Sequence, residues 1–597
     1  MLFGRHMSKY YLKYILFYLI GIVGLALVDY YQLKIPEYLG DIVTAVEGSN
    51  DITVASISVI IYGLVKVGII MCLGRMLWRF ALFNASGRIE ASLRKEMFLK
   101  SERLSQRYYH ENKVGSVMAW FTTDLETIEE FIGWGFVMLF DAIFLSVVVI
   151  IKMLKLNLVL SLISFIPLLL IIIWGGLVEK FMAMRWTNRQ KEFDRLYDFT
   201  QENFTGIRVI KAFVKGTNEI HTFAKIAKKN QDTNIDFVKV SVLFDVIISL
   251  LIAAIMAIIL GFGGWFAYST AIGKEIVIFG QSINLEAGEL VTFLGYFESI
   301  VWPMMALGQI VSMLSRASAS LKRISRFLDE NEEIKNNPNS YKLEDVKGKI
   351  TFKNYSFEYP GSKQHSLDNI SFEINPGETI GVIGKIGSGK TTLVNSLLRL
   401  YNVEPNTIFI DDHDIMDCDI NSVRESISYV PQDNFLFSDK IRNNIAFSNR
   451  GIDFARIKKA AQFADVDENI SCFKEGYDTL SGERGVTLSG GQKQRISIAR
   501  AYIKEAPIMI MDDSVSAVDV KTEENILKNI KENRNGKTTI VIASRVSTVS
   551  HLSRILVLNE GKIEAFDTPE NLLKTSPTYQ NMVRLQALEA EVEGGNH

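Results

Sequence analysis

The stretch ETIGVIGKIGSGKTTLVNSLLRL, residues 378–400, decides the fold of the C-terminal half of this chain. Its apolar run up to Ile383 predicts a buried strand, and its later apolar run up to Leu400 predicts a helix. Between the two runs lies the pattern G-x-x-x-x-G-K-T, from Gly384 to Thr391. In a strand–loop–helix setting, this pattern forms a loop whose backbone N–H groups surround phosphate oxygens at a helix N-terminus. The sequence therefore predicts an α/β domain that binds a nucleotide.

Polar residues of this loop and of a later strand carry the expected chemistry. We expect Lys390 to reach the β- and γ-phosphates and Thr391 to bind Mg²⁺. Further along, the apolar run 508–511 predicts a buried strand ending in Asp512, whose carboxylate would hold Mg²⁺ through water. ATP and Mg²⁺ are therefore the expected cofactors. The other residues of the loop expected to contact nucleotide are Gly384, Gly387, Ser388, Gly389 and Thr392.

A second glycine-rich turn, LSGGQ at residues 488–492, opens another predicted helix. Such a turn at a helix N-terminus is also an anion site. One domain does not need two such turns for a single nucleotide, so the economical interpretation is that this turn covers ATP held by a partner domain. The residues expected to make that contact are Ser489, Gly490, Gly491 and Gln492.

The first 330 residues hold nearly all the long apolar runs of the chain. A membrane-spanning helix needs about 20 mostly apolar residues. Basic residues are concentrated in the connections 84–132 and 178–240, which places these connections and both termini in the cytoplasm. Six spans are predicted, at about 13–33, 56–80, 134–154, 156–177, 242–268 and 285–313. The expected domains are an all-α six-helix transmembrane domain over 1–330, a linker over 331–347 and a nucleotide-binding domain over 348–597.

Ionisable residues occur inside the apolar runs, where a charge is costly and usually faces a polar cavity or another charge. Glu298 lies near mid-depth of the sixth run. Two interpretations remain open: Glu298 lines a translocation path and favours cationic substrates, or it pairs with Lys66. The ionisable residues in these runs are Asp29, Lys66, Asp141, Asp245 and Glu298.

Composition and cysteine spacing give no reason to expect several other classes of partner and site. The net charge of −2 gives no electrostatic reason to expect a nucleic-acid partner. Cys72, Cys418 and Cys472 are far apart and form neither a metal pattern nor a disulfide framework. The first apolar run lacks a small-residue cleavage site, so we expect a retained membrane helix. A chain rich in Lys, Asn and Ile indicates a bacterial plasma membrane.

These motifs together resemble a half-transporter of the ABC exporter family, over nearly the full chain. LSGGQ at 488–492 matches the signature motif of that family, and TGIRVIKAF at 205–213 matches its second long intracellular connection. The resemblance implies a P-loop ATPase domain with an antiparallel β subdomain and a helical signature subdomain. It also implies coupling helices near residues 105–111 and 196–203.

The same resemblance implies roles for further residues of the ATPase half. Tyr359 resembles the aromatic residue that stacks on adenine. Gln432 matches the loop glutamine that touches Mg²⁺ and the coupling helices. Gly482–Gly485 resembles the short loop that precedes the signature in exporters. Asp519 lies in the segment SAVD, residues 516–519, which matches the loop that communicates between two ATP sites.

Two positions depart from the family pattern. After the aspartate that ends the strand, the family has a glutamate that orients the attacking water, and this chain has Asp513. After the next strand, the family has a histidine that contacts the γ-phosphate, and this chain has Ser544. Aspartate draws the carboxylate back by about 1 Å, which can cost about 10²-fold in rate. Serine is shorter than histidine and cannot carry its positive charge.

Both departures bear on the same γ-phosphate, so the chain resembles one subunit of a heterodimeric exporter with one degenerate and one competent ATP site. Its own phosphate loop would serve the slow site, and its signature would serve the competent site. The partner subunit would supply an intact glutamate and histidine. The expected function is ATP-driven export of small amphipathic molecules of the multidrug type. The alternatives are export of lipid or peptide, a homodimer with two slow sites, and an ATP-regulated channel or sensor.

Overall fold

The computed structural model describes residues 4–47, 54–274, 276–278, 281–362, 364–515 and 518–594. The chain divides into two compact units. The first unit comprises Met1–Lys100 and Gly115–Asp329, and the second joins Ser101–Val114 to Glu330–His597. A short segment from the N-terminal half therefore belongs to the same unit as the nucleotide-binding half.

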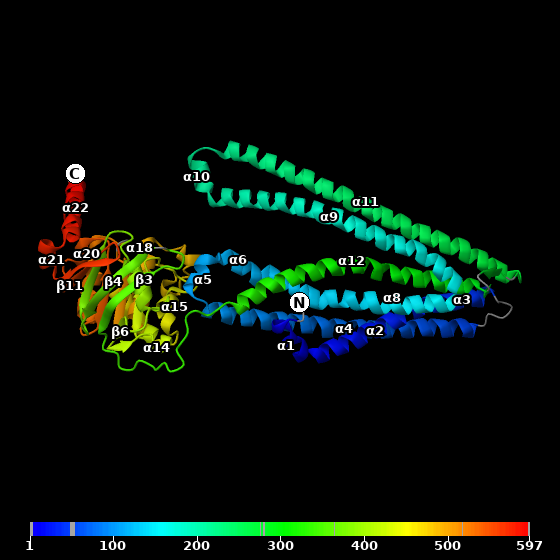
Figure 1. Cartoon of the computed structure of the whole chain (residues 1–597), viewed down its shortest axis with the longest axis horizontal. Coiled ribbons are helices and arrows are strands. Elements are labelled where there is room, and N and C mark those ends of the chain that lie inside the picture. Colours follow the sequence, from blue (N-terminus) through cyan, green and yellow to red (C-terminus); the bar gives the residue numbers. More distant parts are fainter. Residues whose placement is uncertain are drawn as a thin grey trace. The chain divides into compact units, whose positions relative to one another are not determined.

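Long helices and one small β-hairpin make up the first unit (Figure 1). The chain begins with α1 (Arg5–Lys13), α2 (Ile15–Gln32), α3 (Lys34–Glu47) and α4 (Val54–Arg103), and returns with α6 (Val114–Ala119), α7 (Leu125–Glu130) and α8 (Phe136–Leu156). Two π-helical turns lie between these helices: Trp120–Asp124 separates α6 from α7, and Phe131–Gly135 separates α7 from α8. It continues with α9 (Leu158–Thr205), α10 (Ile207–Ala212), α11 (Gly216–Ala271), β1 (Ile276–Ile278), β2 (Gln281–Ile283) and α12 (Ala287–Asp329).

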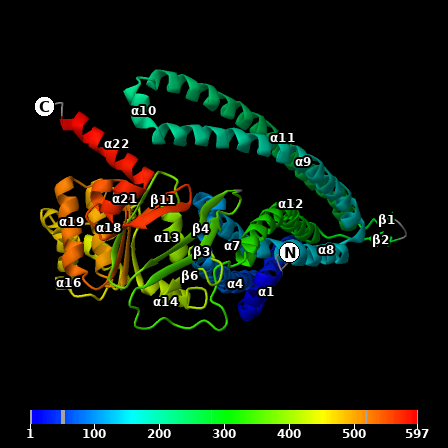
Figure 2. The same cartoon turned by 60° about the vertical axis from the view of Figure 1, so that its left-hand side comes forward.

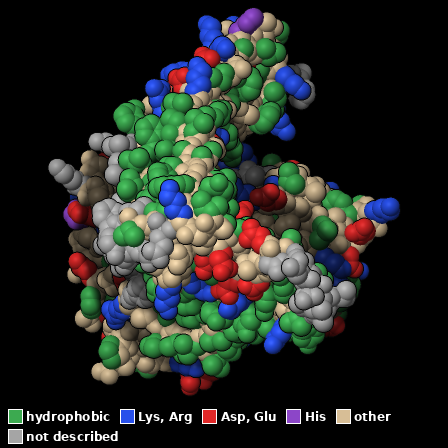
Figure 3. All heavy atoms as spheres, turned by 90° about the vertical axis from the view of Figure 1, so that its right-hand side faces the viewer, with side chains coloured by type: hydrophobic (Ala, Val, Ile, Leu, Met, Phe, Trp, Pro, Cys, Tyr) green, Lys and Arg blue, Asp and Glu red, His purple; other side chains and the backbone are tan. Residues whose placement is uncertain are grey.

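Five helical segments in the described part of the chain are long and apolar enough to cross a membrane. They are Ile15–Glu47, Ile57–Arg103, Val114–Leu156, Gly216–Ala271 and Ala287–Asp329. Each overlaps one of the predicted spans. The remaining predicted span, 156–177, falls in α9, where the apolar helix found among the described residues is Leu158–Leu168. A count of six therefore stays a prediction. Figure 3 shows hydrophobic side chains exposed over much of the face that it presents.

The hairpin of α9 and α11 turns at α10, and the two long helices run side by side (Figure 1). Residues 196–203, predicted as a separate coupling helix, continue α9 without a break. The helix ends only at Gly206, so the short helix of this turn is α10. The first predicted coupling helix, 105–111, agrees with α5 (Gln106–Glu111), which belongs to the second unit.

Glycines permit a very close helix crossing between α3 and α12. Gly40 and Gly288 face each other, and a Cβ on either one would overlap the backbone carbonyl oxygen of the other. Thr292 Oγ1 donates a hydrogen bond to the carbonyl oxygen of Pro36 at 3.2 Å in the same crossing. Small residues suit such contacts because lipid offers no hydrophobic drive for helix association, so close packing must supply it.

Several charged groups of the first unit are paired between helices. Asp124 accepts hydrogen bonds from Arg323 Nε at 2.7 Å and from Arg323 Nη2 at 2.5 Å, which ties a π-helical turn to α12. Glu37 of α3 accepts a hydrogen bond from the Tyr296 hydroxyl at 2.7 Å and pairs with Lys152 of α8. These pairs satisfy charges that would be costly if left alone in an apolar environment.

Within the part of the chain that the structure describes, the predicted intramembrane ionisable residues do not form such pairs. Glu298 and Lys66 are both exposed, and no ion pair joins them among the residues that the structure describes. The interpretation of Glu298 as the partner of Lys66 therefore has no support. Asp29 is 5% exposed, and its Oδ2 is buried with no hydrogen-bond partner in the described ranges. Oδ1 of Asp141 is buried in the same way.

The second unit contains two sheets. The larger has the strand order β12–β11–β5–β10–β9–β8, and the smaller is antiparallel with the order β4–β3–β6–β7. The strands are β3 (Ile350–Glu358), β4 (His365–Ile374), β5 (Thr379–Gly384), β6 (Ile408–Ile410), β7 (His413–Asp414), β8 (Ile427–Val430), β9 (Ile508–Asp512), β10 (Thr538–Ile542), β11 (Arg554–Asn559) and β12 (Lys562–Asp567).

Helices surround these sheets. Figure 2 shows α16, α18 and α19 grouped at one side of this unit and β3, β4 and β6 at the other. The helices are α13 (Lys390–Leu397), α14 (Ile420–Glu425), α15 (Ile441–Ile445), α16 (Phe454–Phe463), α17 (Asp467–Ser471), α18 (Gly490–Tyr502), α19 (Val520–Asn533), α20 (Val546–Val549), α21 (Pro569–Thr575) and α22 (Pro577–Gly594).

The register of the larger sheet places the nucleotide motifs at one edge. The neighbours β5, β10 and β9 are parallel, and Ile542 pairs with both Val382 and Asp512. These strands are buried apolar runs, as expected for parallel strands covered on both faces. Their carboxyl ends therefore bring Gly384 and Asp512 to the same edge, where open α/β sheets bind ligands.

Candidate ATP site

The phosphate loop has the strand–loop–helix geometry that its sequence predicts. The strand β5 ends at Gly384, and α13 begins at Lys390. Gly387 and Gly389 have φ of 80° and 99°, a left-handed conformation that residues with a side chain rarely adopt. A Cβ at Gly389 would also overlap the carbonyl oxygen of Ser366. The two glycines are therefore required by the backbone of the loop.

Two polar groups of the loop have the surroundings of phosphate ligands. Lys390 Nζ donates hydrogen bonds to the carbonyl oxygens of Gly384 at 2.8 Å and Lys385 at 2.9 Å. Burial lowers the pKa of Lys390, although the negative charges of Asp513 and Asp512 act in the opposite direction. Ser388 is 3% exposed, and its buried hydroxyl has no hydrogen-bond partner among the described residues. Both groups offer donors that a phosphate could use.

The carboxylate predicted to hold Mg²⁺ lies at the end of β9. Asp512 is 1% exposed, and its pKa is raised by burial, although a hydrogen bond from Thr391 acts in the opposite direction. The hydroxyl of Tyr429, on β8, donates to Asp512 Oδ2 at 3.4 Å. The sequence-based reasoning missed Tyr429, although its place three residues before Gln432 was a usable signal. Carboxylate, hydroxyl and amide oxygens are the ligands that Mg²⁺ prefers, so this donor set fits the ion.

The residue after Asp512 is Asp513, and its carboxylate lies next to the side chains of Ser544 and Gln432. Asp513 Oδ1 accepts a hydrogen bond from Ser544 Oγ at 3.2 Å, and Oδ2 accepts one from Gln432 Nε2 at 3.4 Å. Asp513 has a φ of 45°, which is rare for a residue with a side chain. Backbone strain of this kind often occurs at functional sites. The three residues that the sequence assigns to catalysis are thus neighbours.

Tyr359 lies beside the phosphate-loop helix. Its hydroxyl is 3.1 Å from Thr392 Oγ1, within hydrogen-bond distance. Its ring packs edge-on against Phe357 and Tyr401, with centroids 5.1 and 5.5 Å away. Tyr401 is a further residue that the sequence-based reasoning missed, because no local motif marks it.

The signature turn begins α18 with a capping box. Ser489 Oγ accepts a hydrogen bond from the backbone N–H of Gln492 at 3.3 Å, and the Gln492 side chain accepts one from the Ser489 N–H at 3.0 Å. Ser489 and Gly490 are exposed, and Gly491 is half-buried. No hydrogen bond or ion pair joins this turn to the phosphate loop within the described ranges. The hydrogen bonds of the turn within the described residues therefore belong to its own helix.

The predicted communication loop is only partly described. Asp519 is exposed and caps α19, accepting a hydrogen bond from the backbone N–H of Thr522 at 3.0 Å. Its carboxyl pKa is lowered by hydrogen bonds from the Thr522 backbone and side chain. Ser516 and Ala517, which the prediction also includes, lie outside the described residues.

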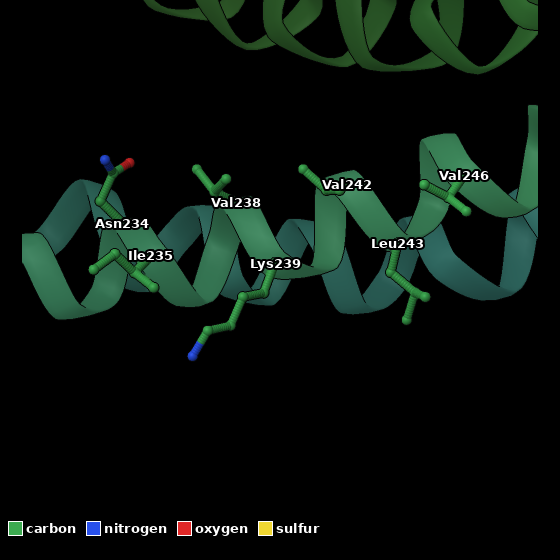
Figure 4. Close-up of a pocket in the computed structure, with 7 residues that line it drawn as sticks. All are labelled: Asn234, Ile235, Val238, Lys239, Val242, Leu243 and Val246. Atoms are coloured by element: carbon green, nitrogen blue, oxygen red, sulfur yellow. The ribbon is translucent and has the colours of Figure 1, made fainter.

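An apolar hollow of about 510 Å³ lies far along the sequence from these motifs, on α11. Figure 4 shows that the side chains lining it come from this helix. Leu243 and Val242 are 58% and 53% exposed there. Since all these residues belong to one helix, the hollow is a surface groove and does not form an enclosed substrate site.

Both halves of the chain match families of known proteins. The family model described as the ABC transporter transmembrane region matches residues 15–304, and the model described as ABC transporter matches residues 367–516. The "Multidrug resistance-like ATP-binding protein MdlA" of Buchnera aphidicola subsp. Schizaphis graminum is 32% identical and covers 99% of both chains. The "Probable multidrug resistance ABC transporter ATP-binding/permease protein YheI" of Bacillus subtilis is 34% identical over 87% of this chain and 86% of the relative.

A solved structure shares the fold. The structure of a bacterial Atm1-family ABC exporter with ATP bound aligns with a TM-score of 0.75 and 24% identity, covering 97% of this chain and 98% of the other. The region matched by the transmembrane model contains the apolar helices, and the region matched by the ABC transporter model contains the phosphate loop, so the sequence matches agree with the fold. The chain belongs to the ABC exporter family, as a multipass membrane protein whose cytoplasmic ATPase domain drives export.

Proposed function

We propose that this chain is one half of a heterodimeric exporter of small amphipathic molecules, and that its own phosphate loop forms the slower of two ATP sites. The observation that carries this proposal is Asp513, which stands where the family has a glutamate. Its carboxylate is held by Ser544 and Gln432, 3.2 and 3.4 Å away. An aspartate held in this way is about 1 Å short of the position that a glutamate would reach, which can cost about 10²-fold in rate.

The proposed roles in this slow site follow from the geometry. Lys390 and the backbone of the phosphate loop bind the phosphates of ATP, and Tyr359 stacks on adenine. Mg²⁺ would be held by Thr391, Gln432 and, through water, Asp512, and it would neutralise charge on the phosphates. Ser544 donates a hydrogen bond to Asp513, so its hydroxyl is already engaged and replaces histidine poorly. ATP binding is retained in this arrangement, while hydrolysis is slowed.

The intact signature turn supports the second half of the proposal. Ser489 and Gly490 are exposed at the N-terminus of a helix of 13 residues, a setting that favours phosphate. We propose that this turn, including Gly491 and Gln492, completes the competent site. The partner subunit would supply the phosphate loop, the glutamate and the histidine of that site. Asp519 would lie in the loop between the two sites.

Exposed apolar side chains support the need for a second subunit. At the turn of the α9–α11 hairpin, Phe204, Phe213 and Val214 are 73%, 71% and 87% exposed. Contiguous apolar surface of this kind usually marks a site for a protein or membrane partner. We therefore propose that this turn docks on the partner subunit, and that the transmembrane domain spans 1–330, the linker 331–347 and the ATPase domain 348–597.

The names of relatives and the charge within the membrane half support a substrate class. The two relatives compared above are named as a multidrug resistance-like protein and a probable multidrug resistance transporter. Glu298 is exposed in the single chain and near mid-depth of its predicted span, where an acidic group would favour amphipathic cations. We propose such cations as cargo.

Purification of this chain with and without its partner tests the heterodimer. We expect the chain alone to bind ATP but to hydrolyse it slowly, and the complex isolated from its native membrane to hydrolyse it about 10²-fold faster. The measurement is phosphate release per chain in lipid nanodiscs, with Lys390→Ala as the control for ATP binding to this chain. Rapid hydrolysis by the chain alone would refute the assignment of a slow site.

A further inference from the structure

The first intracellular connection meets the ATPase domain at a tyrosine that no motif marks. Tyr401 is 6% exposed, and its hydroxyl lies 3.4 Å from His110 Nδ1, at the far end of α5. The chain runs from α4 into α5 and on into α6, so α5 is covalently joined to two membrane helices. Tyr401 therefore contacts the short segment that joins two membrane helices along the chain.

The Tyr401 ring also packs against Tyr359, the residue proposed to stack on adenine. The Tyr359 ring lies edge-on to it, with centroids 5.5 Å apart and an angle of 87° between the planes. Phe357 packs against both rings, with its centroid 5.4 Å from that of Tyr401. Aromatic rings in a close-packed cluster cannot move independently, because a gap of less than 1 Å already loses much of the contact energy. A shift of Tyr359 is therefore passed to Tyr401.

Tyr401 also follows directly on the phosphate-loop helix. The helix α13 begins with Lys390 and ends at Leu397, only a few residues before Tyr401. Tyr359 is tied to the same helix, since its hydroxyl lies 3.1 Å from Thr392 Oγ1. The adenine side and the phosphate side of the proposed site thus converge on one side chain.

The linker holds α5 at the same place. Glu333 accepts hydrogen bonds from Ser105 Oγ at 2.8 Å and from Arg107 Nη1 at 3.0 Å. Asn402, next to Tyr401, donates to the carbonyl oxygen of Glu333 at 2.7 Å. These bonds fix α5 against the ATPase domain whether or not Tyr401 contacts His110. The contact of Tyr401 with His110 is therefore additional to those that dock the helix.

We infer that Tyr401 is a positioning residue that transmits the position of Tyr359 to His110, and so makes α5 respond to nucleotide in this chain's own site. The inference rests on the proposed role of Tyr359 in stacking on adenine. It gives a slow site a function other than hydrolysis: nucleotide retained there holds the intracellular connection in one arrangement. A packing role alone would require the Tyr401 ring but not its hydroxyl.

The test removes only the hydroxyl, by Tyr401→Phe, in the assembled transporter in lipid nanodiscs. Hydrogen exchange of the peptide spanning residues 105–111 is compared with and without the non-hydrolysable analogue AMP-PNP and Mg²⁺. We expect the analogue to slow exchange in the unmodified transporter. The slowing should fall about fivefold in Tyr401→Phe, the change that loss of one ordinary hydrogen bond makes in a two-state equilibrium. Tyr109→Phe is the matched control, because its hydroxyl donates to the carbonyl oxygen of Ser101 within the same connection, and it should behave as unmodified.

Nucleotide binding is measured in the same samples with an azido-ATP photoaffinity probe. We expect labelling of this chain to stay within about twofold in Tyr401→Phe, since one ordinary hydrogen bond away from the nucleotide is lost. His110→Ala should reproduce the loss of slowing, and adding Tyr401→Phe to it should change nothing more. Unchanged slowing in Tyr401→Phe, or no slowing in the unmodified transporter, overturns the inference. Failure of the proposed ATP site would look different, as absent labelling of the unmodified chain.

Discussion

Asp513 combines an unusual side chain with an unusual backbone. Its φ of 45° is tolerated better by aspartate than by most residues with a side chain. The backbone is held independently of the side chain, since the Asp513 N–H donates to the carbonyl oxygen of Ile542 at 3.0 Å. A longer acid at this position should therefore start from the same backbone and reach about 1 Å further into the site.

The double variant Asp513→Glu/Ser544→His should restore hydrolysis at this chain's own site. We expect a gain of about 10²-fold, because the carboxylate reaches the attacking water and the histidine contacts the γ-phosphate. Phosphate release is measured in the assembled transporter after the partner's competent site has been disabled. Ser544→His alone is the control and should give little gain, since Asp513 stays short. An equal gain from the single variant would show that Asp513 does not limit the rate.

Residues of the ATP site differ in how well sequence alone predicts them. Lys390 and Thr391 belong to a local pattern in which spacing and backbone geometry determine the chemistry, and the structure places them as that pattern requires. Tyr429 and Tyr401 reach the site through strand pairing and ring packing between segments distant in sequence. A local pattern carries no information on such contacts, so Tyr401 could not be predicted, whereas the place of Tyr429 three residues before Gln432 was a usable signal.

At the level of elements, an ion pair joins the start of β5 to β11. Arg554 donates to Glu378 Oε1 through Nε at 2.5 Å and to Oε2 through Nη2 at 2.7 Å. Burial is the largest single influence on the pKa of Glu378 and raises it, but the hydrogen bonds from Arg554 and Asn375, together with the positive charge of Arg554, leave that pKa lowered. Because the pKa is lower in the folded state, the stabilisation is present above the unfolded pKa of about 4.3 and is lost as pH falls through the folded value.

Glu378→Gln should lower the free energy of unfolding of the ATPase domain at pH 7 by about 1.5–3 kcal/mol, the value of hydrogen bonds to a charged group. The difference from the unmodified chain should shrink as pH falls below about 4, where the unmodified glutamate becomes protonated. Thermal unfolding followed by ATPase-domain fluorescence at several pH values measures both effects. A pH-independent difference would mean that the ionised carboxylate is not the stabilising form.

Elements of the two halves were predictable to different degrees. Apolar runs of about 20 residues are expected to form helices in lipid, because a helix of that length spans the bilayer and satisfies its own backbone hydrogen bonds. Five predicted spans accordingly overlap long apolar helices. The end of α9 could not be predicted from such runs, since residues 178–205 are polar and helical without interruption. Only Gly206 marks the turn, which explains why the short helix follows the predicted residues 196–203.

The whole molecule contains two glycine-rich turns at helix N-termini, and no hydrogen bond or ion pair joins them among the described residues. The phosphate loop has its strand, helix and acidic partners in place, and the signature turn of Ser489 is exposed and forms its bonds within α18. The α9–α11 hairpin likewise carries apolar side chains at its turn that the chain itself leaves exposed. Both features are explained if a second subunit covers them.

Pairing across subunits makes an asymmetric prediction for two variants of this chain. Ser489→Arg should place a cation and a long side chain where the signature turn contacts the partner's ATP, so hydrolysis by the assembled transporter should fall by about 10²-fold or more. Asp513→Asn should change the same rate by no more than about twofold, because the slow site contributes little turnover when a single misplaced group already costs it about 10²-fold. Steady-state phosphate release of both variants, with complex formation checked by size-exclusion chromatography, provides the comparison. The reverse order, with Asp513→Asn inactive and Ser489→Arg active, would assign the competent site to this chain's own phosphate loop.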